Sequence, residues 1–316
     1  MMVSDDPWMA AMRRGDFTGA WAISDALLHE RLRRGERPHV GPRHLQWIWN
    51  GEPLIGKRVL VRCYHGLGDT VQFVRFAAPL RALAKEVIVW AQPPLVPLVA
   101  TAAGVDRALP LHDGVPEVSF DAEIELMELA HALRVDANAI RRETPYLFPA
   151  RRASTLSRSP TELLVGVVWR AGDWDERRSV PAALLAPLAR LPGLRLCSLQ
   201  CGTPGADASL IPAQDVSSLD VETTAANLRA LDLFICIDTF AAHLAGALGI
   251  PTWVLLHSDC DWRWLSEGSE CLWYPSVRLF RQSREGECGS VIEEVAAALQ
   301  ALSTRRCRSS AVEPAG

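Results

Sequence analysis

The sequence predicts an α/β protein built from two domains, each with a parallel sheet. Apolar runs of strand length alternate with helix-length segments from residue 57 onward. Strands that are apolar along their whole length are typical of parallel sheets covered on both faces. The alternation stops at a polar stretch rich in Arg and Ser, residues 151–161, and starts again at Leu163. Two such runs with a linker between them indicate two Rossmann-like domains facing a cleft.

The composition is that of a globular protein with room for two cores. The chain has 316 residues, of which 49% are apolar and 22% are charged, values close to ordinary globular usage. The formal net charge is −4. Proteins that bind nucleic acid normally carry a basic excess, so we expect no nucleic-acid partner.

Targeting and redox signals predict a cytoplasmic protein. Residues 1–17 lack the basic start and apolar core of a secretory signal. The most apolar stretch, residues 233–256, contains Asp238, His243 and Pro251, which favours a buried strand–helix–strand over stable membrane insertion. The eight cysteines form no Cys-x-x-Cys pair, a pattern typical of buried free thiols in a reducing compartment rather than of a metal cluster.

Residues 1–155 divide into a helical start and a first α/β domain. Residues 1–50 are expected to form a helical hairpin, and one interpretation is the remnant of a helical repeat. A break rich in Gly, Pro and Arg at residues 34–43 ends it. The first α/β domain, residues 51–155, is expected to contain strands at 59–64, 87–90 and 122–126 and a helix at 70–84.

The second α/β domain is predicted at residues 156–302, followed by a disordered tail at residues 303–316 that is rich in Ser, Arg and Pro. Its strands are expected at 163–169, 194–200, 233–237 and 252–256, and its helices at 181–190, 221–231, 239–248 and 291–302.

The first candidate site follows the first predicted strand, at His65, Gly66, Gly68 and Asp69. Glycines at a strand-to-helix turn let the backbone pass close to a ligand at the carboxyl edge of the sheet. Position 71 is not the third Gly of a dinucleotide fingerprint, and no Gly-Lys-Ser/Thr of a P-loop follows. Asp69 has two interpretations. It stabilises the N-terminus of the next helix, or it is a general base that this terminus keeps ionised.

The second candidate site follows the strand at 233–237. Asp238 ends this strand and Thr239 can cap the next helix, which would leave backbone N–H groups for a diphosphate. His243 lies about one turn further along the same helix. The alternative is structural, with Asp238 as a cap and His243 as a hydrogen-bonded core residue.

Two loops at strand ends could support these sites. Trp169 ends a strand and precedes a loop that contains Arg177 and Arg178, whose guanidinium groups suit phosphate oxygens. The alternative for this loop is a solvated charge run. After the last core strand, residues 259–265 contain two Asp residues followed by an Arg between two tryptophans. They could seat a sugar or a base, or they could pack one domain on the other.

Six segments, taken in order, carry a resemblance to a known family. They are HGLGDTVQF (65–73), VGVVW (165–169), SLQ (198–200), DTFAAHLAGALG (238–249), DWRWL (261–265) and WYPSVRLFRQ (273–282). They lie within residues 52–302, and this part of the chain resembles the ADP-heptose:lipopolysaccharide heptosyltransferases. The resemblance is greater to the heptosyltransferase-like domains that follow tetratricopeptide repeats in bacterial proteins.

The resemblance implies a GT-B architecture that binds the acceptor mainly in the first domain and a nucleotide-sugar in the second. It implies inverting, metal-independent transfer to a glycan, lipid-linked or protein acceptor, and the nucleotide-sugar is a substrate rather than a cofactor. It places Asp69 at the catalytic base, beside an acceptor-side loop of His65, Gly66 and Gly68. The donor-binding residues that it implies are Asp238, Thr239, His243, Arg177, Arg178, Trp169 and Gln200.

One position departs from the family pattern. Cys201 stands where relatives commonly carry a lysine or another basic residue, so phosphate binding would depend on Arg177, Arg178 and Thr239. This departure keeps a second interpretation open, a degenerate transferase that acts as a binding or scaffold protein. A NAD-dependent epimerase is disfavoured, since the third glycine and a Tyr-x-x-x-Lys pair are both missing.

Overall fold

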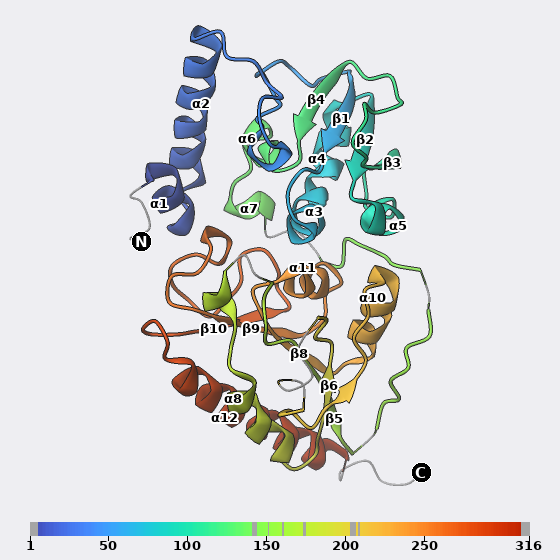
Figure 1. Cartoon of the computed structure of the whole chain (residues 1–316), viewed down its shortest axis with the longest axis vertical. Coiled ribbons are helices and arrows are strands. Elements are labelled where there is room, and N and C mark those ends of the chain that lie inside the picture. The colour runs from blue at the N-terminus through green and yellow to red at the C-terminus, as the bar shows by residue number, and fades with distance from the viewer. Residues whose placement is uncertain are drawn as a thin grey trace. The chain divides into compact units, whose positions relative to one another are not determined.

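The computed structural model describes residues 6–140, 144–150, 152–159, 161–172, 175–202, 207 and 209–310. The chain divides into two compact units (Figure 1). Unit 1 comprises Met1–Ala150 and Asp261–Ser266, and unit 2 comprises Arg151–Cys260 and Glu267–Gly316. Each unit contains one parallel sheet, which confirms the predicted α/β class.

The sheet of unit 1 has four strands in the order β3-β2-β1-β4. Its two central strands, β2 and β1, have completely buried valines, such as Val87 and Val89 in β2 and Val59 and Val61 in β1, as expected for parallel strands covered on both faces. The strands are β1 (Arg58–Arg62), β2 (Glu86–Ala91), β3 (Arg107–Pro110) and β4 (Ala122–Glu125).

The helix predicted at residues 70–84 is interrupted. It consists of α3 (Leu67–Phe73), a 3-10 turn η2 (Val74–Phe76) and α4 (Ala77–Leu83). Pro79 falls in the first turn of α4, where its missing N–H breaks no helical hydrogen bond. The other helices along this part of unit 1 are η1 (Arg43–Leu45), η3 (Pro93–Leu95), α5 (Val96–Val99), α6 (Glu128–Ala132) and α7 (Ala137–Ile140).

The predicted N-terminal helical segment is present as α1 (Pro7–Arg13) and α2 (Phe17–Arg33), which pack together in unit 1 (Figure 1). The carboxylate of Asp16 caps α2 by accepting a hydrogen bond from the Gly19 N–H at 2.9 Å. The Trp21 indole is buried and donates to the Val135 carbonyl at 2.8 Å. The segment therefore belongs to the core of unit 1.

The sheet of unit 2 has six strands in the order β10-β9-β8-β5-β6-β7. Its three central strands, β9, β8 and β5, are buried at every residue. The strands are β5 (Leu163–Val167), β6 (Leu194–Ser198), β7 (Gln214–Asp215), β8 (Leu233–Ile237), β9 (Thr252–Leu256) and β10 (Val277–Arg281). The helices are η4 (Glu176–Arg178), α8 (Ala182–Leu185), η5 (Ala186–Arg190), α10 (Val221–Ala230), α11 (Phe240–Ala247) and α12 (Cys288–Ser310).

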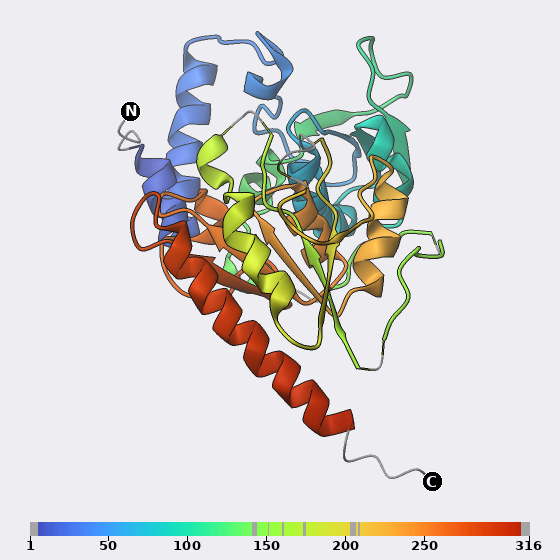
Figure 2. The same cartoon turned by 60° about the horizontal axis from the view of Figure 1, so that its bottom comes forward.

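Helix α12 corrects the expectation of a disordered tail from residue 303. The helix continues to Ser310 (Figure 2). Ser303 is buried and its hydroxyl donates to the Pro192 carbonyl at 2.8 Å, while Arg306 pairs with Asp232 at 2.9 Å. These contacts hold the end of the helix against unit 2, although its sequence from residue 303 onward is mainly polar. The remaining tail positions, 311–316, lie outside the described residues.

Two further expectations concern membranes and thiols. Across the part of the chain that the structure describes, no helix combines the length and apolarity needed to cross a membrane. The cysteines at positions 63, 197, 236, 260, 271 and 288 are buried free thiols, and Cys201 is a half-buried one, in agreement with the expectation for scattered cysteines.

Candidate functional site

Asp69 lies at the start of α3, just beyond the carboxyl end of β1. Gly66 is the residue before the helix, and its N–H donates to Oδ2 of Asp69 at 2.9 Å. Gly68 is the second residue of the helix. The structural interpretation of Asp69 as a helix-terminal carboxylate is therefore confirmed.

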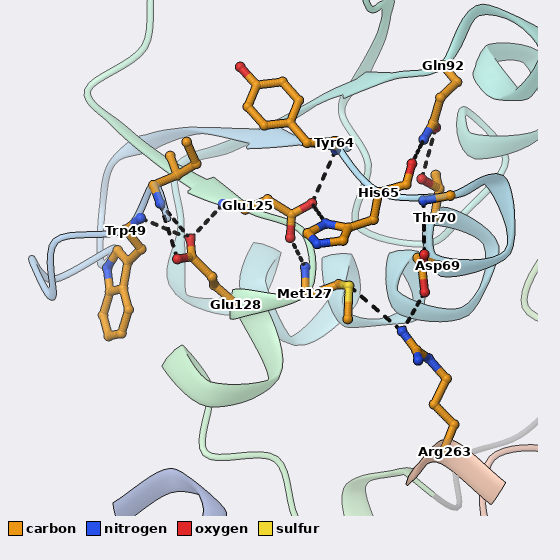
Figure 3. Close-up of polar contacts among 12 residues, drawn as sticks. Trp49, Tyr64, His65, Asp69, Thr70, Gln92, Glu125, Met127, Glu128 and Arg263 are labelled. Carbon is orange, nitrogen blue, oxygen red and sulfur yellow. Dashed lines mark hydrogen bonds and ion pairs between the residues drawn. The ribbon is translucent and has the colours of Figure 1, made fainter. Parts of the chain in front are cut away.

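The other oxygen of Asp69 pairs with a residue that is distant in sequence. Nη2 of Arg263 lies 2.5 Å from Oδ1 of Asp69 (Figure 3). Arg263 comes from the 3-10 turn η6 (Trp262–Trp264), in the segment that packs within unit 1. Its guanidinium also bonds Asp261 at 2.8 Å and stacks on the Trp262 ring at 4.6 Å. The DWRWL segment thus supplies a cation that fixes the orientation of the Asp69 carboxylate.

His65 forms a second acid–imidazole contact beside Asp69. Its Nδ1 lies 2.9 Å from Oε1 of Glu125, the last residue of β4 (Figure 3). Glu125 is 1% exposed and also accepts hydrogen bonds from the Tyr64 and Met127 N–H groups. Burial lowers the pKa of His65, but the hydrogen bond and charge of Glu125 outweigh it, so the pKa is raised overall.

Two side chains hold the loop that carries His65 and Asp69. Gln92, which follows β2, donates from its amide to the His65 carbonyl at 2.7 Å. The Thr70 hydroxyl donates to the same amide group at 2.9 Å. The loop after β1 is thereby joined to the end of the neighbouring strand, as Figure 3 shows.

Sequence reasoning missed Glu125 and Glu128. Glu128 accepts hydrogen bonds from three backbone N–H groups, those of Ile48, Trp49 and Glu125, at 2.9–3.3 Å. Burial nevertheless raises the pKa of Glu128 to about 7, because the cost of desolvating the charge exceeds the gain from these donors. Glu125 ends β4 and Glu128 begins α6, so the available signal was a pair of acids on either side of a strand end.

Glu128 makes stability depend on pH. Its folded-state pKa of about 7 lies above the ordinary value of 4.5, so the folded protein binds an extra proton between these values. The free energy of unfolding therefore falls as pH rises from 4.5 to 7, by about 3 kcal/mol from this group. We expect Glu128→Gln to remove that slope in denaturant unfolding measured between pH 4.5 and 8. Parallel pH curves for wild type and variant would contradict it.

In unit 2, Asp238 directly follows β8 and Thr239 precedes α11. The Thr239 side chain makes no capping hydrogen bond to the helix, and its hydroxyl donates instead to the Ile237 carbonyl at 3.4 Å. The first N–H groups of α11 are therefore not taken by a side-chain cap. A helix N-terminus of this kind carries partial positive charge and can bind an anion.

His243 lies against Asp238 from the second turn of α11. Its Nε2 is 3.8 Å from Oδ1 of Asp238, and its Nδ1 is 3.0 Å from the Tyr274 hydroxyl. His243 is 5% exposed and Tyr274 is completely buried. The structure therefore brings the predicted pair of Asp238 and His243 together, and it adds Tyr274 as the residue that orients the imidazole.

Gly246 leaves room for that tyrosine. A Cβ atom at position 246 would lie 2.4 Å from the Tyr274 ring. We expect Gly246→Ala to push the ring away, which costs about 1–3 kcal/mol of stability by overpacking and moves the hydroxyl from His243. Thermal unfolding should show a lower Tm, and Gly289→Ala is the matched control because a Cβ there meets no neighbour. Equal Tm values for the two variants would refute this.

The two predicted arginines take different places. Nη1 of Arg178 donates to the Asp238 carbonyl at 3.0 Å, which puts this guanidinium at the start of α11. Arg177 instead pairs with Asp175 at 2.9 Å and with Asp259 at 3.4 Å. Asp173 and Trp174 of the same predicted loop lie outside the described residues.

Trp169 and Gln200 lie at the carboxyl edge of the same sheet. The Gln200 side-chain oxygen accepts hydrogen bonds from the Trp169 and Arg170 N–H groups at 3.0 and 2.8 Å. Its amide donates to the Cys201 carbonyl at 3.0 Å. Gln200 therefore joins the ends of β5 and β6, and Trp169 is 2% exposed.

Among the residues that the structure describes, no group of three or more His, Cys, Asp or Glu side chains could hold a metal ion.

The chain is similar in sequence to a curated protein, although no known family profile matches it. Protein FlbA of Caulobacter vibrioides is 26% identical over 290 residues, a match that covers 80% of this chain and 48% of FlbA. The chain thus spans about half the length of this curated relative.

Three solved structures are similar in fold. A glycosyl transferase family 9 protein from Veillonella parvula has a TM-score of 0.55 at 14% identity, covering 80% of this chain and 99% of its own. Escherichia coli ADP-heptose lipopolysaccharide heptosyltransferase II has a TM-score of 0.53 at 14% identity, with 78% and 99% covered. The iron-containing heptosyltransferase TibC, solved with ADP-D-β-D-heptose, has a TM-score of 0.52 at 16% identity, with 80% of each chain covered. The chain therefore has the GT-B-like fold of the heptosyltransferase-like glycosyltransferases.

Proposed function

We propose that the chain is an inverting glycosyltransferase that moves a sugar from a nucleoside-diphosphate donor to a hydroxyl acceptor. The observation that carries this proposal is the cluster of Asp238, His243 and Arg178 around the N-terminus of α11. A cation and free helical N–H groups at one point suit a diphosphate. The adjacent carboxylate can accept hydrogen bonds from sugar hydroxyls.

The proposed reaction uses Asp69 as the base. The acceptor oxygen bonds to the anomeric carbon while its proton passes to the Asp69 carboxylate. The bond from that carbon to the diphosphate breaks on the opposite face, and the electron pair leaves with the diphosphate. Arg178 and the α11 N-terminus would stabilise the growing negative charge, a contribution that is often the largest in catalysis.

We infer that the donor is an ADP-linked heptose, transferred without a metal ion in the cytoplasm to a glycan, lipid-linked or protein hydroxyl. Support for the donor comes from heptosyltransferase II, which is named for ADP-heptose, and from TibC, whose structure contains ADP-D-β-D-heptose. Buried free thiols fit a reducing compartment. A binding protein that has lost transfer is the second candidate, and the half-buried Cys201 in place of a basic residue favours it.

Release of nucleoside diphosphate from ADP-heptose, UDP-glucose and GDP-mannose tests this proposal, because slow hydrolysis to water needs no known acceptor. We expect ADP release from ADP-heptose above that from the other donors, unchanged by EDTA. Release that EDTA abolishes would contradict metal independence. No release from any donor, together with nucleotide binding, would favour the binding protein.

A further inference from the structure

Unit 1 contains a pocket whose walls are rich in indole. Its volume is about 430 Å³, and it lies between α2, residues 44–49 and the region where β4 ends. Five of the chain's eleven tryptophans line it, together with Phe73. These tryptophans are Trp8, Trp21, Trp47, Trp49 and Trp262. Such a concentration of flat apolar surface in one cavity is typical of a small-molecule site.

Hydrogen bonds fix the edges of three of the five indole rings. Three of the indole N–H groups donate to other parts of unit 1: Trp8 to the Ser24 hydroxyl at 3.1 Å, Trp21 to the Val135 carbonyl at 2.8 Å and Trp49 to the Glu52 carbonyl at 2.9 Å. The Trp8 and Trp262 rings also meet edge to face, with centroids 5.4 Å apart. Binding a ligand against preformed walls costs little ordering entropy.

Glu125, Glu128 and Arg31, which line the pocket, each contact another group of unit 1. Glu125 pairs with His65, and Glu128 accepts backbone N–H groups. Arg31 at the wall lies over the Trp47 ring at 5.3 Å. Since these charges already have partners, the pocket suits an uncharged ligand. His65 uses Nδ1 for Glu125, so Nε2 on the other side of its ring can bond a ligand hydroxyl.

We propose that this pocket holds a neutral pyranose ring of a glycan that accepts the transferred sugar. A pyranose has apolar C–H faces that can lie on indole and hydroxyl groups at its edge that can reach His65. The inference rests on the proposed transferase function, and it selects a glycan acceptor over a protein one.

The pocket reaches the proposed base through shared residues. Met127 and Trp262 line it, and Arg263, which pairs with Asp69, contacts both of them. Trp262 therefore connects the wall of the pocket to the pair of Arg263 and Asp69. This arrangement depends on α1 and α2, so the N-terminal helices are part of the acceptor site.

Saturation-transfer NMR with methyl glycosides of glucose, galactose, mannose and N-acetylglucosamine tests the inference directly. Sorbitol is the matched control, since it has hydroxyl groups but no ring face. We expect at least one glycoside to receive saturation where sorbitol does not. Trp47→Ala and Trp8→Ala, both at half-buried positions, should weaken that binding about tenfold, and Trp47→Phe should restore most of it.

Calorimetry with ADP on the same preparations separates this inference from the proposed function. ADP binding without any glycoside signal above that of sorbitol would overturn the inference alone. Binding that is unchanged in both alanine variants would overturn it too, as would a serine- and threonine-rich peptide that displaces the glycosides. Glycoside binding without binding of ADP, or of UDP or GDP titrated in the same way, would support the pocket as a glycan site and contradict the transferase.

Discussion

Asp69→Asn is expected to lower the release of ADP from ADP-heptose by about 10²–10⁴-fold, the range typical of losing a general base. The amide keeps an oxygen that can accept the Gly66 N–H, but it cannot take a proton from the attacking hydroxyl. Because Asp69 lies in unit 1 and the proposed nucleotide site lies in unit 2, ADP binding should be unchanged. The rate is measured under single-turnover conditions.

Asp121→Asn is the matched control for that experiment. Asp121 also pairs with an arginine, Arg58, at 2.7 Å, but at the start of β1 rather than at its end. Its loss should leave the rate unaltered. If both variants lose activity equally, the effect reflects a weakened unit 1. If Asp69→Asn remains fully active, another group takes the proton.

Arg178→Ala is expected to weaken ADP binding about 10–100-fold, since a hydrogen bond to a charged group contributes about 1.5–3 kcal/mol. Arg178 is anchored on the Asp238 carbonyl at the start of α11, where the diphosphate would lie. Calorimetry with ADP measures the change.

Arg177→Ala is the control, because the neighbouring arginine is already paired with Asp175 and Asp259. Its removal should change ADP affinity by less than about threefold. The reverse order of effects would mean that Arg177 leaves its carboxylate partners to bind phosphate. If both variants change ADP affinity equally and only slightly, neither arginine binds the donor.

The strands that determine the fold could be predicted because they are buried. β1, β5, β8 and β9 are continuous apolar runs, and each was expected close to where it lies. β3 was missed because it begins with Arg107, ends with Pro110 and is only partly buried at the edge of its sheet. Edge strands have little apolar signal to detect.

The candidate site was predictable where its residues follow strands directly, as Asp69 and Asp238 do. Contacts between segments that are distant in the sequence were not predictable. Arg263 is 194 positions from Asp69 in the sequence, and only the packing of residues 261–266 into unit 1 brings them together. The capacity of Arg178, but not Arg177, to reach Asp238 likewise depends on the 3-10 turn at Glu176–Arg178.

The stability of α12 beyond residue 302 has a similar cause. Its last described turns are polar in sequence, and a local reading of composition therefore predicted disorder. The Ser303 hydroxyl and the Arg306 guanidinium find partners at Pro192 and Asp232, more than a hundred residues and about seventy residues away. Tertiary contacts of this kind override local propensity.

Isothermal titration of the protein with ADP, UDP and GDP, repeated on Arg178→Ala and Asp69→Asn, tests the central claim most directly. The proposal predicts that ADP binds wild type and Asp69→Asn with the same affinity and binds Arg178→Ala about 10–100-fold more weakly, because Arg178 lies at the start of α11, where the diphosphate would bind. If no nucleotide binds wild type even at millimolar concentration, unit 2 is not a donor site and the transferase proposal is contradicted.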